Sequence, residues 1–565
     1  MSLYSSLQLA NNSLRASQIG LQVVGQNIAN ANTPGYIRAE AILAPSNTQR
    51  HGGLLLGMGV QVQGVVQKID NFLESRLRSA ISDTSGAEAQ ENVYVQLEEL
   101  LGELSDSDLS TSLNNFFNSI SEVLNQPESV SVRNLVVLQG DTLTSHLRRF
   151  AAHGRQIAKD LNTRVINATD DINRLTSEIQ ALNIRITEIE GGRSSKSDAV
   201  GLRDQRLVAL SELSKLVNIK VVEHTNGTLG VYTGGDYLVL GGERRELKAV
   251  DVSEGGLPRS EVRLIATDAP LQITGGEVHG VINARDSIVA GFLDDLDNFA
   301  STLAFEFNKI FSSGQGMTGY TSITSEFAVD GAQLSLDAAG LHYTPVNGSF
   351  EVLMLNKHTG LTQTTRIDVD LNGFDEDTSL ADLAAALNTI DGLSAEVTDN
   401  GRLALKSNAP DTTFSFNNDT SGVLAALGIN TFFSGTSAGN ISINQAIVKD
   451  PSKFAASTGG IGEDTANAVK LAAFIDRPLE TANGQSLAFV YDRFTSKITQ
   501  ASTVSQSVAS GFRSFEQTLL GEKLSISGVS IDEEAIRMIS YQRTFQASAK
   551  YISTVSELLE LLVNL

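Results

Sequence analysis

The two end segments of the chain carry the same spacing of apolar residues, and this spacing limits what they can fold into. In each segment apolar residues recur after four and then three positions, which places them on one face of an α-helix. Such a face packs against another helix, as in a coiled coil. Neither end has a neighbouring element to fold against, so we expect the two helices to pack against each other and against other copies of the chain. The stripes comprise Leu3, Leu7, Ala10, Leu14, Ser17, Leu21, Val24, Ile28 and Ala31 at the start, and Ala535, Met538, Gln542, Phe545, Ala549, Ile552, Ser556, Leu559 and Val563 at the end.

These stripes predict a self-assembly surface. Two other helical stripes, in residues 161–189 and 487–519, have a similar rhythm, but we interpret them as faces buried within the chain itself, as in most amphipathic helices. The predicted self-assembly residues are Leu3, Leu7, Leu14, Leu21, Val24, Ile28, Met538, Phe545, Ile552 and Leu559.

Composition excludes several classes of function. The formal net charge of the 565 residues is -23, and the sequence has no basic stretch to neutralise phosphates, so we expect no nucleic-acid partner. The absence of cysteine excludes a disulfide scaffold, a thiolate nucleophile and a cysteine-ligated metal. The first residues lack the basic start and apolar core of a secretory signal, and no run reaches the roughly 18 apolar residues of a membrane span. We therefore expect no membrane association.

The order of helical and strand patterns predicts an α+β, multidomain fold. It would have paired, coiled-coil-like terminal helices, an elongated helical-bundle domain and inserted β-rich outer domains. The predicted turn after the first helix is Thr33-Pro34-Gly35-Tyr36, and Ser530 with Glu533 predicts a capping box for the last helix. The expected domains are terminal helices in 1–35 and 530–565, an extended connector in 36–71, a helical domain in 72–217, 286–315 and 464–525, a β-rich insertion in 218–285, and an outer β-rich domain in 316–463.

Four local patterns imitate sites of known chemistry. Residues 314–319 match a dinucleotide-binding fingerprint but follow a helix instead of a strand, so we interpret them as a flexible loop. Residues 435–439 match a nucleophile elbow, yet no histidine follows them. Residues 368–373 resemble half of a calcium loop but fit a strand that ends in a turn. His146 and His153 lack metal-ligand spacing. We expect no enzymatic activity, cofactor or metal site.

Two short segments at the ends resemble a known pair of signatures. Residues 27–36 read Asn-Ile-Ala-Asn-Ala-Asn-Thr-Pro-Gly-Tyr and resemble the N-terminal signature of bacterial flagellar axial proteins, which form the rod, hook and hook-associated parts. Residues 530–534, 541–547 and 552–554 resemble the partner signature at the C-terminus. The residues that carry this axial-protein motif are Asn27, Asn30, Asn32, Thr33, Pro34, Gly35, Tyr36, Gln542, Arg543 and Gln546.

Segments in the middle of the chain indicate which of the axial-protein families the chain resembles. Residues 202–206 (Leu-Arg-Asp-Gln-Arg), 210–213, 234–241 and 417–433 resemble the hook-associated protein 1 family. The resemblance implies a structural subunit at the hook–filament junction, exported unfolded through the flagellar type III channel to the extracellular flagellum. It also implies as partners other copies of the chain in a tubular or ring assembly, the hook protein, a second junction protein, and a cytoplasmic export chaperone on the C-terminal helix.

Several alternatives stay open at this point. The chain could instead be a hook or distal rod subunit, or an extracellular adhesin that binds through its β-rich block in residues 320–455. A wall hydrolase would need an acid pair in a cleft, and the sequence shows only scattered carboxylates. Asn27, Asn30 and Asn32 could cap the end of their own helix or bond to neighbouring subunits.

Overall fold

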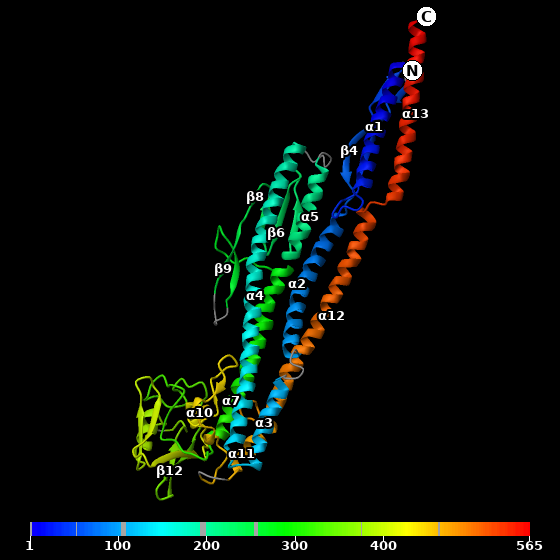
Figure 1. The fold of residues 1–565 in the computed structure, drawn as a ribbon. Helices are drawn as coiled ribbons and strands as arrows, with labels where there is room; N and C mark the ends of the chain where they lie inside the picture. The colour runs from blue at the N-terminus through cyan, green and yellow to red at the C-terminus, as the bar shows by residue number, and fades with distance from the viewer. Residues whose placement is uncertain are drawn as a thin grey trace. The chain divides into compact units, whose positions relative to one another are not determined.

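The computed structural model describes residues 3–51, 54–102, 109–191, 199–252, 258–374, 376–460 and 464–564. The chain divides into two compact units, each assembled from separate stretches of sequence (Figure 1). Helices and small antiparallel sheets occur in both units, which confirms the α+β multidomain class. The finer five-part division of the chain stays a prediction. The first unit comprises Met1–Val93, Ala158–Asp286 and Thr503–Leu565, and the second comprises Tyr94–Ile157 and Ser287–Ser502.

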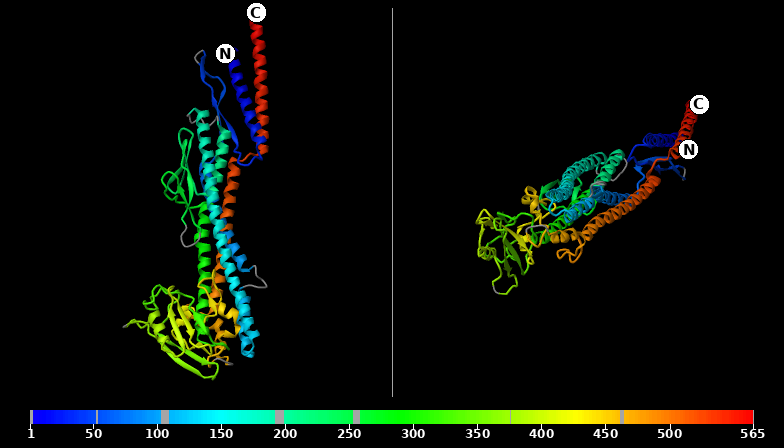
Figure 2. Two further views of the ribbon diagram at one scale, coloured as in Figure 1. Left: turned by 60° about the vertical axis from the view of Figure 1, so that its left-hand side comes forward. Right: turned by 60° about the horizontal axis from the view of Figure 1, so that its bottom comes forward.

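In the first unit the two terminal helices lie side by side, as both views of Figure 2 show. They are α1 (Leu3–Ala29) and α13 (Ile531–Val563). The antiparallel pair β1 (Ala39–Pro45) and β4 (Val60–Gln67) packs against α1, with a bulge between Ile42 and Leu43. Between these two strands the chain forms the antiparallel pair β2 (Thr48–His51) and β3 (Leu54–Gly57).

The rest of the first unit combines long helices with two sheets. Asn226-Gly227 is the turn between the first two strands of the larger sheet, with Gly227 at φ +84°. The larger sheet has the order β5-β6-β7-β8, namely Lys220–Glu223, Leu229–Thr233, Asp236–Leu240 and Glu243–Arg244. The smaller sheet pairs β9 (Leu247–Asp251) with β10 (Ser260–Leu264). The helices are α5 (Val200–Leu216) and α6 (Gly276–Asn283), with a π-helix over Ala284–Val289.

Three long helices contribute residues to both units: α2 (Asn71–Gly102), α4 (Val130–Glu190) and α12 (Leu487–Ser527). In α4 the stripe predicted to be core is buried from Leu161 to Ile186, and only its last member, Ile189, is exposed. In α12 the stripe is buried at Leu487 and Phe494, but Val508 and Phe515 are exposed. The intramolecular interpretation therefore holds throughout most of the first stripe and for part of the second.

The second unit has a core rich in phenylalanine. Phe307 of α7 (Ala290–Ser312) contacts the rings of Phe116 and Phe433, at centroid distances of 5.5 and 5.2 Å. The part of the predicted helical domain in 286–315 thus consists of the π-helix and α7. The other helices of this unit are α3 (Leu109–Asn125), α8 (Leu380–Leu387), α9 (Val423–Leu427), α10 (Gln445–Lys449) and α11 (Ala466–Ala472), with 3-10 turns at Pro451–Lys453 and Phe474–Asp476.

The strands of the second unit lie between α7 and α11 in sequence. They form one sheet of order β13-β12-β16, a second of order β11-β15-β14, and the short pair β17-β18. Residues of the first two sheets, with α8 and α9, share one hydrophobic cluster that includes Phe350, Phe414 and Phe416. The strand bounds are Ser322–Thr324, Gly348–Asn356, Thr362–Val369, Leu393–Val397, Leu403–Ser407, Thr412–Asn417, Phe433–Ser434 and Ser442–Ile443 for β11 to β18.

Candidate functional site: the terminal helix pair

The terminal helices pack against each other in an antiparallel arrangement with a regular register. Asn27 bonds to Glu534, a Cβ on Gly20 would lie 2.6 Å from the ring of Tyr541, and the hydroxyls of Ser13 and Ser548 are 3.0 Å apart. In each pair the two residue numbers add up to 561, and successive pairs are seven residues apart. This is the seven-residue repeat of a coiled-coil seam, so the expected pairing of the two ends is confirmed.

The residues of this seam are not the ones that the sequence pattern selected. On α1 the buried or half-buried positions along the seam are small or polar. The predicted stripe shares Ala10, Ser17 and Val24 with the seam, but its other members are displaced by one residue. Small side chains let two helix backbones approach closely, whereas leucines would hold them apart. The α1 seam consists of Ser6, Ala10, Ser13, Ser17, Gly20, Val24 and Asn27, and the corresponding residues of α13 are Glu534, Tyr541, Ser548 and Val555.

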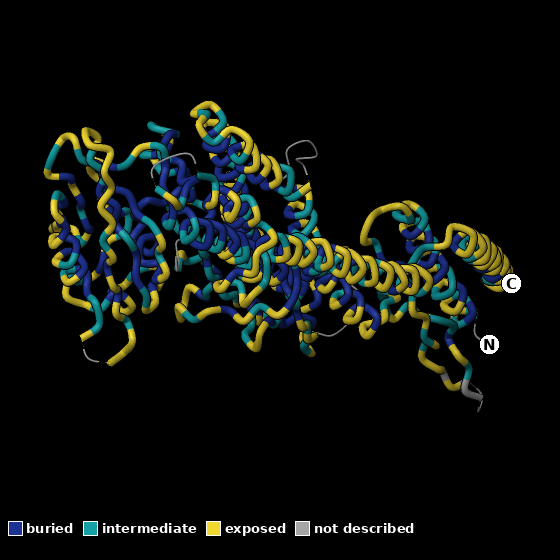
Figure 3. The backbone as a smooth tube through the Cα atoms, turned by 90° about the horizontal axis from the view of Figure 1, so that it is seen from below, coloured by how far each residue is buried: buried dark blue, intermediate teal, exposed yellow. Residues whose placement is uncertain are grey.

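The large apolar residues of the prediction lie beside this seam and stay partly accessible. On α1 the half-buried row is Leu3, Leu7, Leu14, Leu21 and Ile28, and on α13 it is Met538, Phe545, Ile552 and Leu559; Val24 alone of the predicted set is buried. Figure 3 shows the C-terminal helix as mostly exposed, and Ile536, Leu561 and Leu562 are between 62% and 69% exposed. Exposed apolar rows of this kind mark surfaces that bind other proteins.

A buried polar cluster around Asn27 connects the C-terminal end of α1 to the start of α13. The Asn27 amide nitrogen donates to the Ala39 carbonyl and to Glu534 Oε2, both at 2.9 Å. Its oxygen accepts from the Tyr36 hydroxyl at 2.8 Å and from the Ala39 amide at 3.0 Å. All four hydrogen-bonding positions of this fully buried side chain are therefore filled. Within this chain Asn27 does not cap its own helix but joins α1, β1 and α13.

Arg38 completes the cluster through the other oxygen of the same carboxylate. Its Nε and Nη2 lie 2.9 and 2.7 Å from Glu534 Oε1, and Nη2 is also 3.0 Å from Glu533. Burial lowers the pKa of Arg38, but hydrogen bonds and attraction from Glu534 and Glu533 outweigh it, so the pKa is raised. Because Glu533 faces Arg38, the predicted capping box is only half formed: the Ser530 side chain caps the Glu533 amide. Arg38 and Glu534 were not among the predicted site residues.

The predicted turn at Tyr36 positions this cluster beside α5. Tyr36 N donates to Thr33 O at 3.2 Å, and Gly35 has φ +77°, so Pro34 and Gly35 occupy the two centre positions as predicted. A Cβ at Gly35 would lie 2.4 Å from Val208 Cγ2 of α5. Burial, followed by the nearby carboxylates of Asp204 and Glu534, raises the pKa of Tyr36 to about 12.

Asp204 of α5 faces the start of the β1–β4 pair. Gln67 donates to its carboxylate at 2.5 Å. Burial raises the pKa of Asp204 to about 6, although the hydrogen bonds from the Gln67 side chain and the Ile37 backbone act in the opposite direction. This carboxyl group thus titrates near neutral pH at the contact between α5 and the residues that follow α1.

The other residues of the axial-protein motif lie on the surface. Asn30 is half-buried and donates to the Gln26 carbonyl, so it caps the last turn of α1. Asn32 and Thr33 are exposed. On α13 the side chains of Gln542, Arg543 and Gln546 are exposed as well, and the structure does not bring them to the Asn27 cluster.

The imitations of catalytic sites have structural explanations. Residues 314–319 form a loop after α7, as expected, with backbone bonds from Gln315 to Ser457 and from Met317 to Ser452; their flexibility stays a prediction. Residues 435–439 precede a strand, and the 368–373 segment ends β13, as predicted. His146 Nδ1 lies 2.7 Å from Ser112 Oγ. Within the described ranges no group of three acidic or histidine side chains could hold a metal ion, and no helix is long and apolar enough to cross a membrane.

Comparison with known proteins agrees with this arrangement. Residues 94–324 match the model of the flagellar hook-associated protein FlgK helical domain, and residues 521–565 match that of the flagellar basal body rod FlgEFG protein C-terminal region. The chain is 26% identical to flagellar hook-associated protein 1 of Escherichia coli K12, over 99% of this chain and all of that protein. It is 27% identical to the protein of the same name from Bacillus subtilis 168, over 56% of this chain and 69% of that one.

The chain is thus similar over nearly its whole length to flagellar hook-associated protein 1. A solved structure of the flagellar hook junction protein FlgK from Burkholderia pseudomallei has the same fold, with a TM-score of 0.50 and 16% identity over 80% of this chain and all of that one. The hook-associated protein 1 family consists of structural components of the flagellum that assemble with other axial proteins. The match at residues 521–565 covers α13, the helix that carries Glu534.

Proposed function

We propose that this chain is a structural subunit of the bacterial flagellum that forms the junction between hook and filament and polymerises through α1 and α13. Its site of action is the extracellular flagellum, which it reaches through the flagellar type III export system. The full-length similarity to hook-associated protein 1 favours this role over a hook or distal rod subunit, and no observation favours an adhesin.

One observation carries the proposed mechanism: α1 contacts α13 mainly through small residues, and both helices leave large apolar residues partly accessible. The row at Leu7, Leu14 and Leu21 is only half-buried beside the seam. Burial of apolar surface contributes about 25 cal/mol per Å², so covering such rows with neighbouring copies favours assembly. A seam of small residues alone removes little apolar surface from water. We infer that the pair is weakly held in a free chain and is fixed when neighbours cover the outer rows.

The same surface suits the expected partners. Other copies of this chain, the hook protein on one side and a second junction protein on the other would each cover part of the exposed rows. In the cytoplasm an export chaperone would bind α13, where Ile536, Leu561 and Leu562 are accessible. The two β-containing parts, 218–285 and 316–463, would face away from the assembly contacts.

Deletion of the gene tests the assignment. We expect cells without this protein to complete their hooks, to lack attached filaments and to release filament protein into the medium. Loss of the hook itself would instead assign the chain to the hook or rod.

A double variant tests the surface. Leu14→Gln with Leu21→Gln should prevent restoration of filaments in the deletion strain, because both side chains belong to the row that neighbours would cover. The control, Gln18→Ala with Gln22→Ala, changes two exposed polar residues of the same helix and should restore filaments. Restoration by both double variants would contradict the proposed surface.

A further inference from the structure

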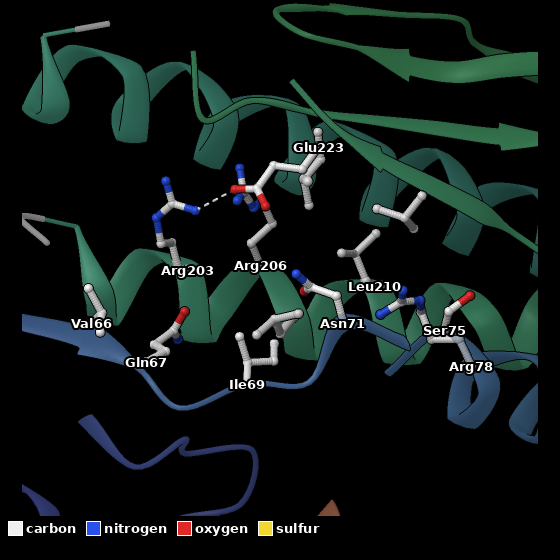
Figure 4. Close-up of a pocket in the computed structure, with 13 residues that line it drawn as sticks. Val66, Gln67, Ile69, Asn71, Ser75, Arg78, Arg203, Arg206, Leu210 and Glu223 are labelled. Carbon is white, nitrogen blue, oxygen red and sulfur yellow. Dashed lines mark hydrogen bonds and ion pairs between the residues drawn. The ribbon is translucent and has the colours of Figure 1, made fainter. Parts of the chain in front are cut away.

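A cavity of about 260 Å³ lies within the first unit, away from the terminal helix pair (Figure 4). It is bounded by α5, by the start of α2, by the segment that joins β4 to α2, and by strands β5 and β6. Three arginines line it: Arg203 and Arg206 from α5 and Arg78 from α2. Because a buried charge is costly unless it is paired, each of these three arginines needs a compensating group.

Arg203 is balanced by carboxylates of the chain itself. Its Nη2 lies 2.9 Å from Glu190 and its Nη1 lies 3.0 Å from Glu223. Burial lowers the pKa of Arg203, but the hydrogen bonds and charges of these two glutamates raise it overall. This arginine therefore has no need of an added anion.

Arg206 differs, although it is just as deeply buried. The hydrogen bonds described for it use only Nη1, which donates to Asn183 Oδ1 at 2.8 Å and to the Gly227 carbonyl at 2.9 Å. Its Nε is buried without a hydrogen-bond partner among the described residues, and no ion pair is described for it. Burial, and then repulsion from Arg203, lower the pKa of Arg206 to about 10, although the charges of Glu223 and Glu190 act in the opposite direction. The charge of this guanidinium is incompletely compensated.

Arg78 is the second incompletely compensated charge. Its ion pair with Glu74 is long, at 3.9 Å, because the other oxygen of Glu74 lies 2.7 Å from Lys523 Nζ. Burial lowers the pKa of Arg78, and the attraction of Glu74 does not restore it. Figure 4 shows Arg78 beside Ser75 on α2, across the cavity from the α5 arginines, with Asn71 between them.

We propose that this cavity binds a carboxylate group between Arg78 and Arg206. A planar carboxylate matches the guanidinium geometry and provides one negative charge in a buried setting where ionic hydrogen bonds are strong. Asn71 and Ser75, both exposed at the same cavity, supply further donors. A doubly charged phosphate fits less well, because the Glu223 carboxylate lines the same cavity and would repel it.

The carboxylate could belong to a free small acid or to an acidic side chain of a neighbouring flagellar subunit. Calorimetric titration of the purified full-length chain with sodium succinate, against sodium chloride at equal ionic strength, tests the first source. Recovery of the chain with purified hook–basal bodies from a strain that lacks the natural gene tests the second. This second arm rests on the function proposed above.

Two variants of α2 disturb the cavity without touching the buried α5 arginines. Arg78→Met removes one charge, and Ser75→Met places a larger side chain at the exposed edge of the cavity. Arg76→Met is the matched control, because Arg76 lies on the same helix with the same charge but stacks on the rings of Phe72 and Phe515 instead of lining the cavity.

The outcomes distinguish a free acid from a subunit side chain as the source of the carboxylate. They also distinguish failure of the carboxylate site from failure of the proposed function. Succinate binding with a dissociation constant below about 1 mM, weakened at least about tenfold by both variants and unchanged by the control, supports a free acid. No succinate binding, with recovery lost in both variants and kept in the control, supports a subunit side chain. Binding and recovery that both variants leave unchanged would overturn the carboxylate site. Failure of the unaltered chain to enter hook–basal bodies would refute the proposed function but not the titration result.

Discussion

At the scale of single residues, the buried amide of Asn27 has the largest number of dependent partners in the terminal pair. It satisfies the Ala39 amide and carbonyl, the Tyr36 hydroxyl and one oxygen of Glu534. A buried polar group that loses its partner costs roughly 1–3 kcal/mol, and more when it is charged. The cluster therefore depends on this one side chain more than on any exposed residue of the motif.

Asn27→Ala should weaken the terminal pair by at least about 2 kcal/mol, because it leaves several buried groups unpaired at once. We expect the amount of this variant recovered with hook–basal bodies to fall at least about tenfold. Asn32→Ala is the control, since Asn32 belongs to the same motif but is exposed, and its recovery should be unchanged. Equal recovery of the two variants would show that the cluster does not support assembly.

Asp204 gives a second prediction at this scale, for the dependence of stability on pH. Its pKa is raised from 3.8 to about 6, so between these values the folded chain holds a proton that the unfolded chain releases. The stabilisation from this group is complete below about pH 4 and is lost as the pH rises through about 6.

Asp204→Asn, which mimics the protonated form, should thus raise Tm relative to the unaltered chain, and this difference should grow from pH 5 to pH 7.5. Glu212→Gln on the same helix is the control, because Glu212 is half exposed and pairs only at the surface with Lys215. A difference in Tm that does not change with pH would show that Asp204 is not the titrating group.

At the scale of elements, much of the secondary structure was predictable because local signals determine it. The short helices α8 and α9 are examples, the first with a capping box formed by Ser379 and Asp382. The Pro-Gly turn at residues 33–36 and the Asn-Gly turn at 226–227 depend only on the conformational preferences of those residues. All of these features involve residues that are close in sequence.

The seam of the terminal pair was predicted one residue away from its true position for a physical reason. A pattern of large apolar residues shows where a helix is apolar, but close packing of two helices selects for small side chains. The polar cluster was missed for a different reason: Arg38 and Glu534 are 496 positions apart, and neither shows its partner in the local sequence. One signal was available, because Glu534 is the one charged residue of a seven-residue repeat with Tyr541, Ser548 and Val555, and charged residues are rarely fully buried without a partner.

Two glycines of α1 provide a matched test of the seam. Gly20→Val should disrupt the pair, since a Cβ at that position would lie 2.6 Å from the Tyr541 ring. Gly25→Val changes the helix propensity of α1 equally but meets nothing within 4 Å. We expect only the first variant to lose the ability to restore filaments in the deletion strain. Loss in both variants would point to an effect on the helix itself, and loss in neither would exclude close packing at Gly20.

At the scale of the whole molecule, the proposed weak pairing of the ends predicts how a free chain responds to protease. Brief digestion of the purified monomer should remove both ends and leave a resistant core of about residues 40–520, because segments that open readily are cleaved first. Mass spectrometry of the products gives the boundaries. In assembled hook–basal bodies the same ends should resist digestion.

Resistance of both ends in the free monomer would contradict the proposed coupling between assembly and ordering of the terminal helices. Cleavage confined to sites between residues 40 and 520 would be the corresponding result. The comparison needs no variant, since the same chain is measured free and assembled.

The register of the terminal pair has one further consequence, which concerns direction. Because paired residue numbers add up to 561, Leu561, Leu562 and Val563 extend past Leu3, the first described residue of α1, and Figure 1 shows α13 projecting beyond α1 there. The side chains of this projecting segment are apolar and exposed. At the opposite end, the pair closes tightly around an ion pair. A column of subunits that stack through the projecting segment of α13 would have two different ends. We therefore expect such a column to grow in one fixed direction.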